Sequence, residues 1–115
     1  MAADQQTVPR RPGTCCAVAI AIEPQRATEA AELLKVLADP TRLSMLATLR
    51  HALAPVCICD FTAAYELRQP TVSHHMGKLK AAGLVTSHKE GIWVYYRIVD
   101  SLPLAVERVL DAVTT

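Results

Sequence analysis

The fold of this chain is decided by residues 66–75, whose sequence is ELRQPTVSHH. The first three of these residues predict a tight turn. Gln69 followed by Pro70 predicts the cap and the first position of a helix, where the missing N–H of proline costs nothing. A shorter helix is predicted just before the turn, beginning near residues 57–60 and ending near Tyr65. Two helices joined by so short a turn form a helix-turn-helix.

The second helix of this pair is predicted to place one face on the core and the other against DNA. Val72, Met76 and Leu79 recur at the spacing of one helical stripe and are expected in the core. The residues on or near the opposite side carry groups that bind base edges or phosphate oxygens, helped by free backbone N–H groups at the helix start. The predicted DNA contacts of this helix are Gln69, Thr71, Ser73, His74 and Lys78, the last of them on phosphate.

A β-hairpin is predicted after Gly83, where the apolar period changes from about 3.6 residues toward about 2. The expected strands are residues 84–88 and 92–98, joined by a turn at 89–91. Lys89 and Arg97 are expected on or beside that turn, where their charges suit phosphate contacts. Trp93 and Tyr95 are expected to pack the hairpin onto the core. Beside a helix-turn-helix, such a hairpin is a wing.

Three further helices are predicted around this unit. The first begins at Pro24, and the second is capped by Asp39 with Pro40 at its first position. The last helix carries more apolar surface than a small monomer needs. The apolar stripes expected of the three helices are Ala27, Ala30, Leu34 and Leu37; then Leu43, Leu46, Ala47 and Leu49; then Leu102, Leu104, Val106, Val109, Leu110 and Val113.

Four cysteines are the candidate metal ligands. Cys57 and Cys59 stand at a predicted helix start, where the helix dipole is expected to lower a thiol pKa and favour the thiolates that soft ions require. Two residues spaced in this way diverge on a regular helix, so they can share one ion only where the backbone is irregular. Cys15 and Cys16 lie in a polar N-terminal arm. The histidines are not expected to be ligands, because His74 and His75 point about 100° apart.

Composition is consistent with one domain. The chain has 115 residues, of which 51% are hydrophobic, and a net charge of +1. Residues 1–24 are expected to form the arm, and residues 25–115 the DNA-binding and dimerisation domain. No apolar run approaches the roughly 18 residues of a membrane span, and Cys15 to Ile22 is a poor signal peptide. A cytoplasmic protein without a membrane partner is therefore expected, where cysteines favour metal binding over disulfides. No catalytic motif is visible.

The order of the motifs resembles the ArsR/SmtB family of arsenic- and metal-sensing transcriptional repressors over roughly residues 25 to 113. The motifs are LADPTRL at 37–43, CICD at 57–60, QPTVSHH at 69–75, AGLV at 82–85 and GIWVYY at 91–96. The resemblance implies a winged-helix homodimer, formed through the first and last helices. It also implies that the dimer binds double-stranded promoter DNA until an inducer releases it.

The identity of the inducer stays open in the sequence. Arsenic-sensing relatives often carry a third cysteine one turn after the pair, but that position here is Thr62. Cys15 and Cys16 are the only thiols left to complete the site, from the same subunit or from its partner. One of them gives three thiolates, suited to As(III) or Sb(III), and both give four, suited to Cd(II) or Pb(II). The first alternative is favoured.

Two other readings of the chain are weighed against this one. Zinc binding through the last helix is not expected, because residues 101–115 contain no histidine and the carboxylates there are only Glu107 and Asp111, with Asp100 just before. A thiol-based redox sensor, in which either cysteine pair oxidises, is the remaining alternative.

Overall fold

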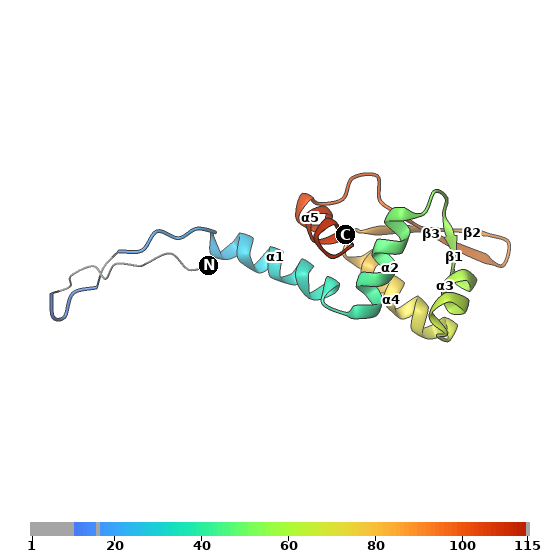
Figure 1. Cartoon of the computed structure of the whole chain (residues 1–115), viewed down its shortest axis with the longest axis horizontal. Coiled ribbons are helices and arrows are strands. Elements are labelled where there is room, and N and C mark those ends of the chain that lie inside the picture. The colour runs from blue at the N-terminus through green and yellow to red at the C-terminus, as the bar shows by residue number, and fades with distance from the viewer. Residues whose placement is uncertain (1–10, 16, 115) are drawn as a thin grey trace.

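The structure is a computed structural model that describes residues 11–15 and 17–114. Five helices and three strands are found in this part of the chain, and they form a winged helix-turn-helix (Figure 1), which confirms the predicted fold. The strands form one antiparallel sheet in the order β1-β3-β2. The elements are α1 (Pro24–Leu37), α2 (Pro40–His51), β1 (Val56–Cys57), α3 (Ile58–Tyr65), α4 (Gln69–Ala81), β2 (Val85–Glu90), β3 (Trp93–Ile98) and α5 (Leu104–Val113).

The junction between α1 and α2 forms as the sequence predicts. Asp39 is the N-cap of α2, and one oxygen of its carboxylate accepts a hydrogen bond from the backbone N–H of Arg42 at 2.9 Å. Pro40 occupies the first turn, where its missing N–H leaves no carbonyl unpaired. Only two residues, Ala38 and Asp39, therefore separate the end of α1 from the start of α2.

The turn between α3 and α4 differs from the prediction by one residue. Glu66 adopts a left-handed conformation with φ 53° and ends α3. The N-cap of α4 is Arg68 and not Gln69, because the carbonyl of Arg68 accepts the N–H groups of Thr71 and Val72, each at 3.1 Å. Gln69 is thus the first residue of the recognition helix, and Pro70 follows it within the first turn.

The wing is shifted relative to the prediction. β2 runs on to Glu90, which pairs with Trp93, so the chain turns at Gly91 and Ile92. Gly91 has φ 62°, which glycine adopts without strain. The expected packing of Trp93 is wrong, because its side chain is 48% exposed, and Tyr96 is the buried aromatic residue of the strand. Alternation along β3 explains this, since Tyr96 and Trp93 lie an odd number of residues apart.

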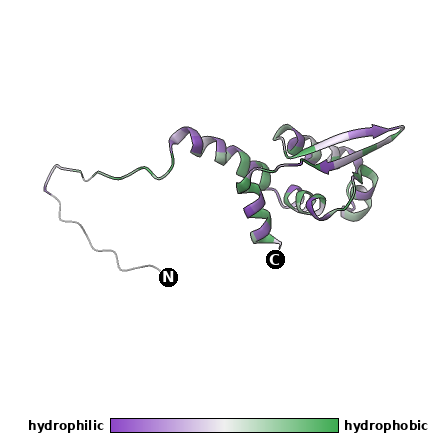
Figure 2. Cartoon of the chain, turned by 90° about the horizontal axis from the view of Figure 1, so that it is seen from above, coloured by the Kyte–Doolittle hydropathy of each residue, from purple (hydrophilic) through white to green (hydrophobic). Residues whose placement is uncertain are grey.

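The core lies between α2, α3, α4 and α5 and the base of the sheet. Apolar and polar residues alternate along the helices (Figure 2), and the buried apolar residues of these helices pack together in this core. Full burial of one such side chain contributes about 1.5–3 kcal/mol. The largest fully buried side chains are Met45, Leu46, Phe61, Val72, Met76, Leu79, Leu84, Val106 and Leu110.

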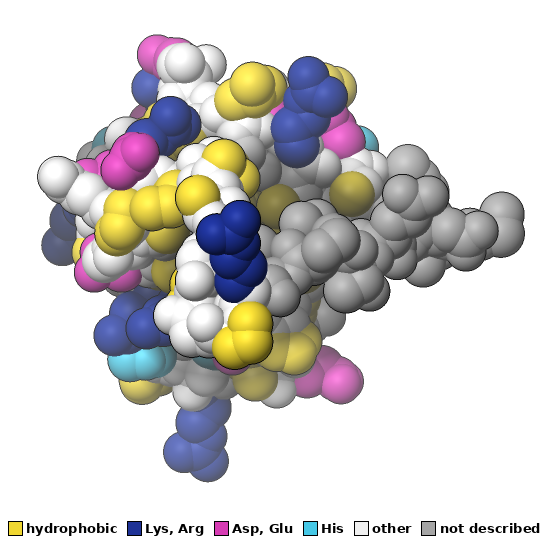
Figure 3. Space-filling view, turned by 90° about the vertical axis from the view of Figure 1, so that its left-hand side faces the viewer, with side chains coloured by type: hydrophobic (Ala, Val, Ile, Leu, Met, Phe, Trp, Pro, Cys, Tyr) yellow, Lys and Arg dark blue, Asp and Glu magenta, His cyan; other side chains and the backbone are white. Residues whose placement is uncertain are grey.

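Some predicted core positions of α1 and α5 lie on the surface of the single chain. Leu34 is 48% exposed, which corrects its place in the buried stripe of α1, whereas Leu37 of the same stripe is buried as predicted. On α5, Leu104 is 64% exposed and Val113 is 53% exposed. Figure 3, seen from the side on which the arm leaves the body, shows apolar side chains interspersed with Lys and Arg. This apolar surface is unpartnered in one copy of the chain.

Candidate functional site

The exposed face of α4 is the face that the sequence assigns to DNA. Val72, Met76 and Leu79 are fully buried. Gln69, Thr71, His74 and Lys78 are exposed and Ser73 is half-buried, so all five predicted side chains remain accessible on one helix. Their contact with DNA stays a prediction.

The start of α4 differs from the expectation in its hydrogen bonding. The N–H groups of Thr71 and Val72 donate to the carbonyl of Arg68, and Pro70 has none to offer. The expected help from these backbone groups is therefore reduced, and the predicted contacts with DNA would rest mainly on side chains. The exposed Arg68 guanidinium stands at the same helix end. Sequence reasoning missed this residue, although a cation directly before a recognition helix is a visible signal.

The two predicted wing cations lie at different ends of the hairpin. Lys89 is exposed and pairs with Val94, close to the turn. Arg97 pairs with Thr86, and the expectation that it lies beside the turn is wrong. Strand residues advance about 3.3 Å each, so Arg97 is roughly 16 Å from the wing tip. Its guanidinium donates to Asp100 at 2.9 Å and to the carbonyl of Ile98 at 3.1 Å.

Cys57 and Cys59 converge at the start of α3. Cys57 is its N-cap and keeps an extended backbone, with φ −71° and ψ 146°. This irregular start brings the sulfurs together, and the Cys59 thiol donates to the Cys57 sulfur at 2.8 Å. Cys57 is buried and Cys59 is exposed. The backbone N–H of Cys57 donates to the Asp60 carboxylate at 3.1 Å, and this bond stabilises the start of α3.

The electrostatics of the thiol pair differ from the expectation. The pKa of Cys59 is raised, first because its thiol donates a hydrogen bond to Cys57, then because of burial and the negative charge of Cys57 and Asp60. The expected lowering by the helix dipole is therefore wrong for Cys59. A protonated thiol must lose its proton before it binds a soft ion, so ion binding here would release protons.

The thiol pair also lies beside the wing. Cys57 belongs to β1, which the sequence did not reveal, and it pairs with Tyr95 of β3. The Tyr95 ring stacks on His88 of β2, with centroids 5.3 Å apart. The pKa of Tyr95 is raised by burial first, and then by the negative charges of the thiols, Glu90 and Asp60. The sheet thus connects Cys57 to both strands of the hairpin.

The described residues do not complete a metal site by themselves. Within 11–15 and 17–114, three or more His, Cys, Asp or Glu side chains nowhere gather as metal ligands would. Thr62, at the position of the missing third cysteine, donates to the carbonyl of Cys59 at 2.8 Å. Cys15 is exposed on the arm. Cys16 lies outside the described residues. The predicted four-cysteine set is therefore represented by one converged pair and one arm thiol.

The remaining histidines have other neighbours. His75 is half-buried between α4 and the α1–α2 junction, 3.5 Å from Arg42. His88 lies 3.4 Å from Glu90. None of the described helices is both long and apolar enough to cross a membrane.

Comparison with known proteins gives one consistent group of relatives. The model of the family described as "Bacterial regulatory protein, arsR family" matches residues 39–87. An uncharacterized HTH-type transcriptional regulator of Methanocaldococcus jannaschii is 40% identical over 83 residues, which cover 72% of this chain and 92% of that protein. The arsenical resistance operon repressor of Escherichia coli is 36% identical over 80 residues, covering 70% and 68%. The cadmium resistance regulatory protein CadC of Listeria innocua is 41% identical over 64 residues, covering 56% and 53%.

Solved structures agree with these relatives. The antimony-specific transcriptional repressor AntR aligns with a TM-score of 0.68 and 29% identity, covering 85% of this chain and 90% of that one. A homodimeric winged helix-turn-helix domain of Mycobacterium bovis, a possible ArsR-family regulator, aligns with a TM-score of 0.62 and 28% identity, covering 85% and 86%.

Proposed function

Because this chain belongs to the ArsR family of bacterial transcriptional regulators, which are DNA-binding proteins and not enzymes, we propose that it is a repressor released from DNA by a metal or metalloid ion. In this proposal a homodimer binds operator DNA and leaves it when As(III) or Sb(III) binds cysteine thiolates. The observation that carries the proposal is the convergence of Cys57 and Cys59 to 2.8 Å, at the start of the helix that precedes the recognition helix.

Operator binding is assigned to α4 and the wing. Ser73 and His74 would reach base edges, and Gln69 and Thr71 would bind bases or phosphates near the helix start. Lys78, Lys89 and Arg68 would position the protein on the phosphate backbone. The support is the accessibility of these side chains on the recognition helix, just before its start and on the wing. Arg97 is left out, because its guanidinium already binds Asp100.

Dimerisation is assigned to α1 and α5. Leu34, Leu104 and Val113 expose apolar surface that a second copy would cover. Two copies related by a twofold axis present two recognition helices to two half-sites. The homodimeric Mycobacterium bovis relative supports this arrangement.

The inducer site is assigned to Cys57 and Cys59 together with the arm thiols. Figure 1 shows α1 leading away from the body, with α3 at the opposite end. The arm that precedes Pro24 therefore starts far from its own thiol pair. This favours a site to which the partner subunit supplies Cys15 or Cys16.

The choice of ion depends on how many arm thiols bind. Three thiolates suit As(III) or Sb(III), and the similarity to an arsenical repressor and to an antimony-specific repressor supports this choice. Four thiolates suit Cd(II) or Pb(II), and the similarity to CadC supports that alternative. Thiol oxidation is the second alternative, favoured by the closeness of the sulfurs. The raised pKa of Cys59 does not separate the two alternatives, because both oxidation and the binding of a soft ion require the thiolate.

The coupling between thiols and DNA follows from the position of Cys57. This residue ends β1 and caps α3, so drawing its sulfur toward an arm thiol would disturb both the wing and the helix that packs on α4. DNA release requires only that the DNA-incompetent dimer bind the ion more tightly. A coupling free energy of about 1–3 kcal/mol is typical of such linkage.

A titration of the reduced full-length protein tests this function. The DNA probe is a duplex selected by the protein from a random-sequence pool, and arsenite, antimonite, cadmium, lead and zinc are added singly. Release by arsenite or antimonite, with loss of free thiols and recovery of all thiols by a chelating dithiol, supports the proposal. In a separate titration with peroxide and no reductant, release by peroxide alone would support the redox alternative. Failure to select any duplex, or retention of DNA with all five ions, would refute the proposed ion-released repressor.

A further inference from the structure

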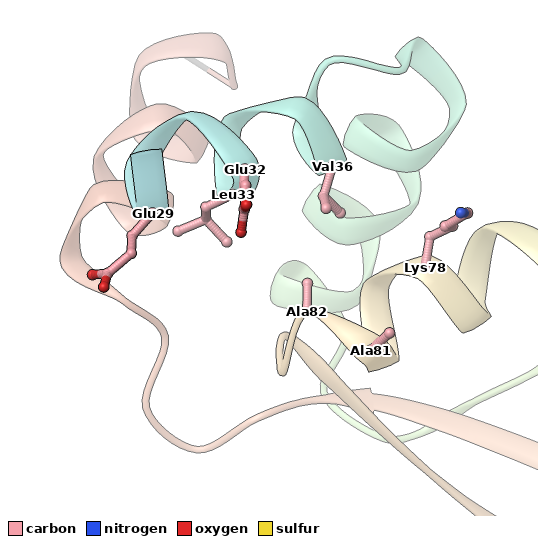
Figure 4. Close-up of a pocket in the computed structure, with 7 residues that line it drawn as sticks. All are labelled: Glu29, Glu32, Leu33, Val36, Lys78, Ala81 and Ala82. Carbon is pink, nitrogen blue, oxygen red and sulfur yellow. The ribbon is translucent and has the colours of Figure 1, made fainter. Parts of the chain in front are cut away.

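An open groove separates the proposed dimerisation helix from the recognition helix. It has a volume of about 360 Å³ and lies between α1 and α4 (Figure 4). Its walls are Glu29, Glu32, Leu33 and Val36 of α1, and Lys78, Ala81 and Ala82 of α4. α1 packs on α2, and α2 packs on α4. Direct packing between α1 and α4 therefore does not fix their angle, which is set through α2 and through side chains that contact both helices.

A polar cluster bridges the two helices near the end of α1. The Nε of Arg42 donates to the carbonyl of Val36 at 2.8 Å, which caps the C-terminus of α1. The Nη1 of the same guanidinium lies 3.5 Å from Nδ1 of His75 on α4. Arg42 thus contacts α1 and α4 while its own backbone belongs to α2. The cluster of Asp39, Arg42 and His75 is called the clasp below.

The charges of the clasp hold its geometry. Asp39 accepts the backbone N–H of Arg42 at 2.9 Å and lies 3.7 Å from Nδ1 of His75. The N–H of Arg42 and the nearby positive charges lower the pKa of Asp39, so its carboxylate stays ionised at neutral pH. Only 14% of the His75 side chain is exposed. Because the Arg42 guanidinium can only donate, Nδ1 of His75 is the acceptor wherever the two groups form a hydrogen bond.

We infer that the clasp of Asp39, Arg42 and His75 sets the angle between α1 and α4, and thereby the spacing of the two recognition helices on DNA. The inference rests on the proposed homodimeric repressor. If α1 lies at the dimer interface, a change in its angle to α4 moves each recognition helix relative to the twofold axis. His75 is in this sense a positioning residue, and its neighbour His74 is the predicted DNA contact.

The geometry makes the spacing sensitive to small rotations. α1 has 14 residues and is therefore about 21 Å long. A tilt of about 10° displaces one end of such a helix by roughly 3.5 Å, close to the rise of about 3.4 Å for one base pair. Loosening the clasp should therefore weaken the preference for one half-site spacing before it weakens the binding of a single half-site.

Two variants separate positioning from simple stability. His75→Phe keeps the ring and removes the nitrogen that accepts from Arg42. His75→Asn is the matched control, because its Oδ1 occupies a place similar to that of Nδ1 and keeps an acceptor. Thermal unfolding at one fixed protein concentration reports whether each variant folds. If His75→Phe does not fold, Arg42→Lys replaces it, since a lysine cannot contact Val36 and His75 together.

The first readout is binding to duplexes in which the half-site selected by the wild-type protein is repeated with different spacers. The wild-type protein and His75→Asn should prefer one spacing over its neighbours by about tenfold, the value of one charge-assisted hydrogen bond. His75→Phe should bind all spacings within about threefold of each other, while its affinity for a single half-site is retained.

The second readout needs no DNA. Residual dipolar couplings of backbone amides report the orientation of α1 relative to α4 in solution. His75→Asn should keep the wild-type orientation, and His75→Phe should lose it. If His75→Phe keeps both the spacing preference and the orientation of the wild-type protein, the inference that the clasp sets the angle between α1 and α4 is wrong. A wild-type protein that selects no duplex would overturn the proposed function instead, and the couplings would still decide whether the clasp sets the helix angle.

Discussion

Cys57 and Tyr95 lie opposite each other in the ladder between β1 and β3. The same cysteine caps α3, the helix that packs against α4. One thiol is therefore attached to the wing through the sheet and to the recognition helix through α3. In the proposed function, a ligand that moves this sulfur would act on the wing and on the recognition helix together, and this is how one small ion would release the proposed dimer.

Replacement of either converged thiol should separate induction from DNA binding. Cys57→Ser and Cys59→Ser should each bind the selected duplex within about threefold of the wild-type affinity, because serine nearly keeps the size of the side chain, and at position 57 its hydroxyl oxygen can cap α3 in place of the sulfur. Neither variant should release DNA with arsenite, cadmium or lead, because the soft ligand is gone. Fluorescence anisotropy of labelled duplex measures both properties. If the Cys57→Ser protein still releases DNA normally with these ions, the proposed site is excluded.

The arm thiols should distinguish the two classes of ion. If the site has three thiolates, one of the variants Cys15→Ser and Cys16→Ser should no longer release DNA with arsenite. The other variant should respond to arsenite almost as the wild-type protein does. If it has four, both should weaken cadmium binding. Titration calorimetry with arsenite and cadmium on the two single variants measures this. A double variant with undiminished affinity for both ions would exclude the arm from the site.

Two residues of α4 should contribute to the affinity for operator DNA but not to the stability of the fold. Ser73→Ala and His74→Ala should each weaken binding of the selected duplex by about 1–3 kcal/mol, the value of a base contact. Their unfolding midpoints should stay unchanged, because neither side chain is buried. His51→Ala, at the exposed end of α2, is the matched histidine control and should change neither property. Wild-type affinity in both α4 variants would contradict the assignment.

The wing should bind phosphate through Lys89 and not through Arg97. Lys89→Ala should lower affinity for all duplexes alike and reduce the slope of log K against log salt by about one. Arg97→Ala should leave the slope unchanged, because its guanidinium binds Asp100 at the hairpin base. Binding isotherms over a range of salt concentrations measure the two slopes. A loss confined to one operator base in Lys89→Ala would show base readout instead.

The cap at Asp39 should make stability depend on acid. The pKa of Asp39 is lowered in the folded chain from its ordinary value of 3.8, chiefly by the N–H of Arg42. Its contribution is therefore present above that value and is lost as the pH falls through the lower, folded pKa. Asp39→Ala should lower the free energy of unfolding by about 0.5–2 kcal/mol at neutral pH.

Urea unfolding at pH 7 and at pH 3, at one protein concentration, measures this effect. The difference between the wild-type protein and Asp39→Ala should shrink at the lower pH. Asp39→Asn keeps a capping oxygen without the titrating charge, so its stability should depend less on pH in this range. A difference that is the same at both pH values would show that the charge contributes nothing.

Local signals in the sequence were enough for much of the fold. Pro24 and Asp39-Pro40 mark helix starts by their own chemistry, and both starts are confirmed. β1 could not be predicted, because two residues have no periodicity and become a strand only by pairing with β3. Leu34 was misplaced, since a helical stripe does not say whether the core or a second copy will cover it.

The site was predictable in its residue types and less so in its details. The convergence of Cys57 and Cys59 follows from an irregular helix start, which the sequence indicates. The raised pKa of Cys59 depends on a 2.8 Å contact between two side chains, and sequence spacing does not determine such a contact. Arg97 was misplaced because it lies five residues after Ile92 of the turn, and strand residues advance about 3.3 Å each, so β3 places the arginine at the base of the hairpin and not at its tip.

The half-exposed indole of Trp93 gives this molecule an optical label of its own. It is the only tryptophan in the chain, and it pairs with Glu90 at the last rung before the wing tip. Indole emission shifts in wavelength as water is removed from or returned to the ring. Excitation at the red edge of the absorption band would select this residue over the three tyrosines. Under the proposed function, the fluorescence of the unmodified protein should therefore record in real time when the wing meets DNA and when an ion releases it.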